Sequence, residues 1–169
     1  MLLSNLQPLL YIKISPELLT VRNVKTGAQL SEVPELAICG GNAKRVVLGF
    51  GANARAAAAT ATAEGDQSSE IINPFAHPRS LVSDFTVGQV LLKTFVKHAH
   101  RATVFAPSPR IVMHPLGSPA GGFTQIERRA LREMALGAGA SEVVLWIGRE
   151  LSDQDVQSDL VLKNDDGRE

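Results

Sequence analysis

The sequence predicts an α/β fold, and three features of the chain indicate it. Short apolar runs rich in leucine, isoleucine and valine come first and are typical of strands. Two helical patterns then alternate with two further apolar strands in the second half. Clusters of glycine and proline separate these segments. We therefore expect a run of strands followed by helix, strand, helix and strand.

The first third of the chain predicts strands. LLYIKI and LLTVRNV, within residues 9–24, are apolar runs joined at Ser15, Pro16 and Glu17, which indicates a hairpin. Two more strands are expected over residues 35–39 and 45–50, because a glycine-rich turn separates them. We expect these strands to continue the same sheet.

A small insertion is expected from about residue 52 to residue 80. Residues 52–63 are rich in alanine and predict a helix, but few large apolar side chains are present to anchor it. A polar loop follows, and two prolines interrupt residues 73–79. The chain should re-enter the main body near Leu81.

Two helices and two strands complete the predicted domain. Apolar residues at helical spacing predict a helix over about residues 86–101, and residues 110–114 predict a short strand. Thr124 and Glu127 have the spacing of a capping box, so another helix should begin there. Residues 142–147 predict a buried strand, because VVLWI is too short and continuous for an amphipathic helix.

The residues after Leu151 predict an acidic tail. Six acidic side chains against two basic ones give it a net charge of −4. High charge with few apolar groups is typical of disorder. We therefore expect a domain over residues 1–151 and a flexible tail over residues 152–169.

The amino-acid composition limits the classes of partner and the cellular compartment that can be expected. A chain of 169 residues with 44% hydrophobic and 20% charged residues is an ordinary globular domain. Basic and acidic residues number 17 each, so no net charge attracts nucleic acid. The single cysteine, Cys39, cannot form an internal disulfide, which favours a reducing compartment. We expect a cytoplasmic protein without a nucleic-acid partner.

Two sequence runs resemble a known family. PSPR, at residues 107–110, and TQIERRALREMALGAGASEVVL, at residues 124–145, are similar to the MreB, rod-shape-determining family of actin-like proteins. LLYIKISPELLTVRNV and VVLGFGANA align more weakly. The resemblance implies subdomain I of the actin-like, ribonuclease H-like ATPase fold, a mixed five-stranded sheet with flanking helices. Only the first half of that fold is matched, so the chain resembles a half-domain.

The resemblance also implies a nucleotide site, from which this sequence departs. In the family, the first hairpin turn holds an acid followed by glycine and threonine or serine, which organise hydrated Mg²⁺ and cradle phosphate. The matching positions here are Lys13, Ser15 and Pro16. Lysine cannot replace a carboxylate beside magnesium, and proline lacks an N–H donor. We therefore expect a degenerate nucleotide-binding turn, with no cofactor and no metal site.

Glu127 is the one residue that the resemblance offers for catalysis. It matches a glutamate proposed in the family to position the attacking water, whereas the capping box explains it without catalysis. The first interpretation is a non-catalytic MreB-like protein in bacterial cell shape or envelope organisation. It would act by protein–protein contacts with a second copy or with the MreB filament. The alternative is an actin-like ATPase half-domain that completes an Mg-ATP site with another chain.

An apolar pair precedes the PSPR run. At this place the resemblance implies a loop tip that meets the inner membrane, and Val104 and Phe105 occupy it. Two exposed apolar side chains would contribute about 2 to 4 kcal/mol of membrane affinity, so the contact would be weak alone. A Phe105 that folds back onto the domain is the alternative. The expected location is the cytoplasm, with the inner face of the cell membrane as a candidate position.

Overall fold

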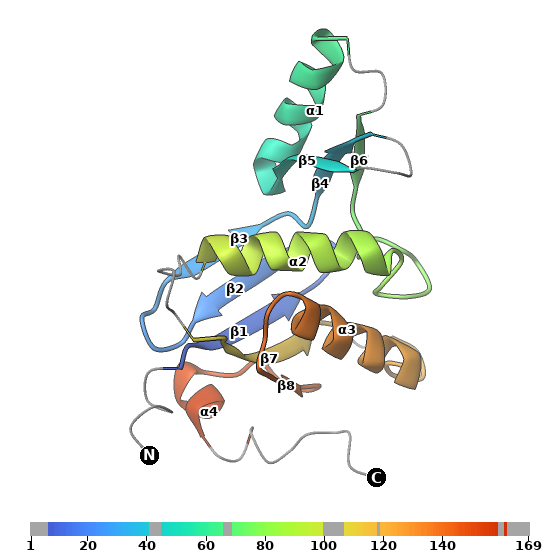
Figure 1. The fold of residues 1–169 in the computed structure, drawn as a ribbon. Helices are drawn as coiled ribbons and strands as arrows, with labels where there is room; N and C mark the ends of the chain where they lie inside the picture. The colour runs from blue at the N-terminus through green and yellow to red at the C-terminus, as the bar shows by residue number, and fades with distance from the viewer. Residues whose placement is uncertain are drawn as a thin grey trace.

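The chain folds around a five-stranded sheet, with a smaller three-stranded sheet beyond one end of it (Figure 1). The computed structural model describes residues 7–40, 45–65, 69–99, 107–117, 119–158 and 161. The larger sheet has the strand order β3-β2-β1-β7-β8, and the smaller has the order β5-β4-β6. The expected α/β fold is confirmed.

The larger sheet is mixed, and β1 (Leu9–Ile14) lies at its centre. β1 pairs antiparallel with β2 (Leu19–Asn23), which pairs antiparallel with β3 (Gln29–Glu32). On its other side β1 pairs parallel with β7 (Arg110–Pro115), and β7 pairs parallel with β8 (Glu142–Leu145). The carboxyl ends of β1, β7 and β8 therefore lie at one edge of the sheet.

One face of the larger sheet is covered by two helices, α2 (Phe85–Ala99) and α3 (Gln125–Gly137) (Figure 1). Successive side chains of a strand point to opposite faces, and Leu10 and Ile12 lie in the core beneath these helices. Both side chains are fully buried. Burial of each such side chain stabilises the fold by roughly 1.5 to 3 kcal/mol.

The opposite face is covered by the segment that follows β8. Tyr11 packs there with Leu151 and Val156 in a second apolar cluster. Val156 lies in α4 (Asp153–Gln157), which begins with a capping box from Ser152. The expectation of a flexible tail over residues 152–169 is therefore wrong for residues 152–158, because a cap and a buried valine fix them.

The smaller sheet contains β4 (Leu36–Cys39), β5 (Val46–Phe50) and β6 (Glu70–Ile72). A 3-10 turn, η1 (Gly51–Asn53), leads from β5 into α1 (Ala54–Ala63). The expectation that residues 35–50 continue the first sheet is wrong, since β4 and β5 pair only within the second. This unit begins earlier in the chain than the insertion expected over about residues 52–80.

The helix α1 is weakly anchored, as its composition predicts. Its buried side chains are Ala54 and Ala58, which form a small separate cluster with Ala37 of β4. An alanine side chain buries little apolar area, so these contacts stabilise the helix less than leucines would. Helix propensity of the alanines therefore carries much of its stability.

Candidate functional site

The three sequence-predicted turn residues lie together at the carboxyl edge of the larger sheet. Lys13 is the penultimate residue of β1, and Ser15 and Pro16 belong to the turn that joins β1 to β2. In α/β proteins, ligands are usually bound at the carboxyl ends of the strands. The structure therefore brings these residues to a place where a ligand site is expected.

The backbone N–H groups of the turn from Ser15 to Leu18 donate hydrogen bonds within the turn itself. The N–H of Ser15 donates to the carbonyl of Leu18 at 2.9 Å. The N–H groups of Glu17 and Leu18 donate to the Ser15 hydroxyl at 3.3 and 3.0 Å. Pro16 has no N–H. The serine side chain thus accepts the donors that a phosphate-binding turn would direct toward its ligand.

The turn is also held from outside. The side-chain amide of Asn73 donates to the carbonyl of Pro16 at 2.8 Å. The amide oxygen of Asn73 accepts the N–H of Phe75 at 3.0 Å, and Phe75 is fully buried. The conformation of the turn is therefore tied to the segment that returns from the smaller sheet.

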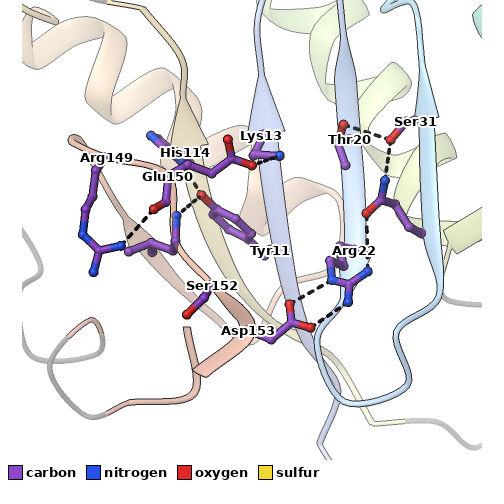
Figure 2. Close-up of polar contacts among 12 residues, drawn as sticks. Tyr11, Lys13, Thr20, Arg22, Ser31, His114, Arg149, Glu150, Ser152 and Asp153 are labelled. Carbon is purple, nitrogen blue, oxygen red and sulfur yellow. Dashed lines mark hydrogen bonds and ion pairs between the residues drawn. The ribbon is translucent and has the colours of Figure 1, made fainter. Parts of the chain in front are cut away.

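Lys13 is paired with an acid of the same chain. Its ammonium contacts the carboxylate of Glu150, which follows β8 (Figure 2). The hydrogen bond from Lys13, and then its charge, lower the pKa of Glu150. A neutralised cation therefore stands where the family resemblance expects a metal-organising acid.

A buried chain of hydrogen bonds lies beside this ion pair. The Tyr11 hydroxyl is 2.5 Å from Nδ1 of His114, and Nε2 of His114 is 3.1 Å from the carbonyl oxygen of Gly148. The N–H of Leu151 donates to the Tyr11 hydroxyl at 3.1 Å. A carbonyl oxygen only accepts, so the imidazole carries its proton on Nε2 and Nδ1 accepts from Tyr11. Burial lowers the pKa of His114, which favours this neutral ring.

Sequence reasoning missed this network. The signal present in the sequence was a single histidine at the end of an apolar strand, IVMHP, where a polar side chain needs a partner if it is buried. His114 is 2% exposed, and its ring stacks on Tyr11 with the ring centroids 5.8 Å apart. The partners lie on β1 and after β8, far away in the sequence.

Glu127 is held by four hydrogen-bond donors. One carboxylate oxygen accepts the N–H and the hydroxyl of Thr124, both at 2.9 Å. The other accepts the N–H of Leu81 at 3.0 Å and the hydroxyl of Ser80 at 3.1 Å. The expected capping box is confirmed. Burial alone would raise the pKa of Glu127, but these hydrogen bonds outweigh it and lower the pKa.

The candidate membrane contact, Val104 and Phe105, lies outside the described residues. In the part of the chain that the structure describes, no helix combines the length and apolar character needed to span a membrane. Among the same residues, no three histidine, cysteine, aspartate or glutamate side chains are grouped so that they could hold a metal ion.

Comparison with known proteins gives one matching family model and several relatives. The model described as MreB/Mbl protein matches residues 30–151. The cell shape-determining protein MreB of Pasteurella multocida (strain Pm70) is 45% identical over 65 residues, which are 38% of this chain and 17% of that protein. The protein of the same name from Escherichia coli (strain K12) is 46% identical over 66 residues, 38% of this chain and 18% of that protein. The chain thus spans about a sixth of the length of these curated relatives.

Solved structures match a larger part of the chain. The crystal structure of MreB 5 of Spiroplasma citri bound to AMPPNP has a TM-score of 0.58 and 17% identity, covering 82% of this chain and 38% of that one. A non-polymerising mutant of MamK bound to AMPPNP has a TM-score of 0.60 and 16% identity, covering 83% and 41%. The likeness shows the actin-like half-domain fold that the sequence resemblance implies.

Proposed function

This chain belongs to the MreB/Mbl family, and we propose that it acts in bacterial cell shape or envelope organisation through protein–protein contacts, without ATP hydrolysis. The relation to cell shape rests on the family and on relatives described as cell shape-determining. The observation that carries the non-catalytic part is the turn from Ser15 to Leu18, whose N–H groups are turned inward.

The residues at this turn do not fit Mg-ATP. A phosphate-binding turn presents several backbone N–H groups to the ligand, and a nearby carboxylate organises the hydrated cation. Here the Ser15 hydroxyl takes two N–H groups, and Pro16 contributes none. Lys13 would repel Mg²⁺ at close range. This disagreement supports a protein that needs no nucleotide cofactor.

The contacts of Glu127 support the same proposal. A carboxylate that accepts four hydrogen bonds is favoured in its ionised form and is a poor proton acceptor. Its oxygens hold the start of α3 and the segment at Leu81 together. We assign Glu127 a structural role.

The proposed partner is a protein of the MreB family. It is either an MreB filament or a second copy of this chain. Support comes from apolar side chains on the outer sides of α2 and α3. Phe85 and Val90 of α2 are 41% and 37% exposed, and Ile126 and Leu136 of α3 are 82% and 42% exposed. Exposed large apolar side chains on two helices that pack against each other favour protein contacts. The proposed location is the cytoplasm, where a weak membrane contact at Val104 and Phe105 would place the protein at the inner face of the membrane.

Co-sedimentation with an MreB-family filament tests the proposal against its rival. We expect the chain to sediment with the filament equally well with and without Mg-ATP. We also expect the mixture to hydrolyse ATP at the rate of the filament protein alone. Hydrolysis that rises in proportion to added chain, and falls with Glu127→Gln, would instead support a half-domain that completes an ATP site.

A further inference from the structure

The segment that crosses the second face of the larger sheet is attached by polar contacts at both ends. We call residues 148–158 the strap. The strap lies beside β1 and β7 and carries Leu151 and Val156 into the apolar cluster on that face. The family match covers residues 30–151, so α4 lies outside the matched residues.

One ion pair fastens the α4 end of the strap to β2, and a second lies within the strap itself. The guanidinium of Arg22 on β2 donates to both carboxylate oxygens of Asp153, at 2.8 and 2.6 Å. Arg149 donates to both oxygens of Asp155, each at 3.0 Å. Figure 2 shows Asp153 joined to Arg22 by dashed lines. These pairs are partly exposed, so they orient the strap more than they stabilise it.

The other end of the strap is fastened by one buried pair of side chains. His114 donates to the carbonyl of Gly148, and Tyr11 accepts the N–H of Leu151, while Tyr11 and His114 bond each other. Two backbone groups of the strap thus depend on one tyrosine–histidine pair. We call this pair the latch.

The latch requires a neutral imidazole. In the closed strap, Nε2–H of His114 donates to Gly148, so Nδ1 must accept the Tyr11 proton. A doubly protonated ring would direct a second N–H at the Tyr11 oxygen, which already accepts from Leu151. The Tyr11 hydroxyl proton would then lose its acceptor within a buried site, which is unfavourable.

The charged and titratable groups around the latch come from β1, the strap and α4: Tyr11, Lys13, Arg149, Glu150 and Asp155. Burial is the largest influence on His114 and disfavours the charged ring. The hydrogen bond to the carbonyl of Gly148 and then the charge of Glu150 favour the charged ring, whereas Lys13 disfavours it. Because Lys13 and Glu150 pair with each other, their opposite effects on the ring largely offset.

We propose that the strap opens from the sheet as a unit on mild acidification, with the Tyr11–His114 pair as its latch. Opening uncovers apolar side chains of the sheet face, including Leu9, Val112 and Val144. The helix-covered face keeps its own core, which shares none of these side chains.

The pH window follows from the state of the ring. His114 is neutral in the closed strap and titrates with an ordinary histidine pKa of about 6.5 once the strap is open. Its contribution to closure is therefore complete above about pH 6.5 and is lost as the pH falls below that value. Each pH unit in this window multiplies the open fraction by up to about ten. The carboxylates of the strap titrate below about pH 4.5, so their loss is separate.

Amide hydrogen exchange of the purified chain between pH 7.5 and 5.5 tests the proposal. After correction for intrinsic exchange rates, we expect exchange within residues 149–158 to rise on the order of tenfold, while β1 and β7 stay protected. His114→Gln should remove this pH dependence. His77→Gln is the matched control, because His77 is exposed and far from the latch in sequence, and it should leave the response unchanged.

Three results would overturn the proposal. Strap amides could exchange at the same corrected rate at both pH values. The strap and β1 could lose protection together, which would be global unfolding. The pH response could persist in His114→Gln. If that variant does not fold, the nitrogen chemical shifts of His114 in the natural chain decide, since a ring protonated at Nδ1 at pH 7.5 excludes the latch.

Discussion

Lys13 and Glu150 are 137 residues apart in the sequence and meet as an ion pair at the carboxyl edge of the larger sheet. The pair joins the penultimate residue of β1 to the strap. The Glu150 side chain is 63% exposed, so the pair contributes only about 0 to 1 kcal/mol to stability. Its importance is positional, because it places a paired cation beside the turn where a nucleotide-binding relative would need an acid.

Charge reversal tests this relationship. Lys13→Asp places two carboxylates together, so we expect faster exchange within residues 149–158 at pH 7.5. Adding Glu150→Lys restores opposite charges and should recover most of the protection. Equal exchange in the natural chain and in Lys13→Asp would show that the pair does not hold the strap.

Loss of the Glu127 carboxylate should destabilise the domain. Glu127→Gln keeps one acceptor oxygen and leaves donors at Thr124 or Leu81 without a charged partner, so we expect a loss of about 1 to 3 kcal/mol in urea denaturation. Glu133→Gln is the control on the same helix, because Glu133 is exposed, and it should change stability by less than about 0.5 kcal/mol.

The same carboxylate predicts a pH dependence. The folded-state pKa of Glu127 is lowered, so its contribution is complete above the unfolded pKa of about 4.3 and is lost as the pH falls through the folded value. Natural chain and Glu127→Gln should therefore differ in stability at pH 6 and converge toward pH 3. A constant difference across this range would contradict the assignment.

Packing of α1 against β5 depends on a glycine. A Cβ at Gly49 would lie 2.8 Å from the Cβ of Ala57 and 3.3 Å from the carbonyl of Asn53. Gly49→Ala should therefore destabilise the smaller unit by about 1 to 3 kcal/mol. In hydrogen exchange, α1 should lose protection while α3 keeps it. Adding Ala57→Gly should give a smaller loss than the sum of the two single changes.

The outer side of α3 should mediate self-association. Ile126 is 82% exposed, so Ile126→Glu should lower the association constant measured by light scattering at least tenfold without lowering the melting temperature. Leu18→Glu is the control, because Leu18 is also an exposed apolar residue, at 44%, but lies in the β1–β2 turn. A natural chain that stays monomeric at high concentration would contradict self-association.

Strongly patterned elements could be predicted from the sequence. The capping box at Thr124 and Glu127 identified the start of α3, and apolar runs identified β1, β2, β7 and β8. β3 and β6 were missed because QLSE and EII are short and lack apolar alternation. Their strand character comes from backbone pairing with a neighbour.

Long-range partners explain what sequence reasoning missed at the site. Lys13, Ser15 and Pro16 were predicted as a group from the family resemblance, which matches them to one local turn. The roles of Tyr11 and His114 depend on a strap that follows the last strand. The strap resembles an acidic tail in sequence, since only two of its residues, Leu151 and Val156, join the apolar cluster. Composition cannot show that Asp153 meets Arg22.

Isothermal titration of the natural chain with Mg-ATP tests the central claim most directly. The comparison protein carries Lys13→Asp, Ser15→Gly and Pro16→Thr, together with Glu150→Gln so that the new aspartate does not face a carboxylate. We predict no binding heat from the natural chain, because its turn donates inward and its cation is already paired. If Mg-ATP gives binding heat with the comparison protein but not with the natural chain, the substituted residues are the cause of the lost nucleotide binding. Micromolar binding of Mg-ATP by the natural chain would contradict the account and would make Glu127 a candidate for catalysis.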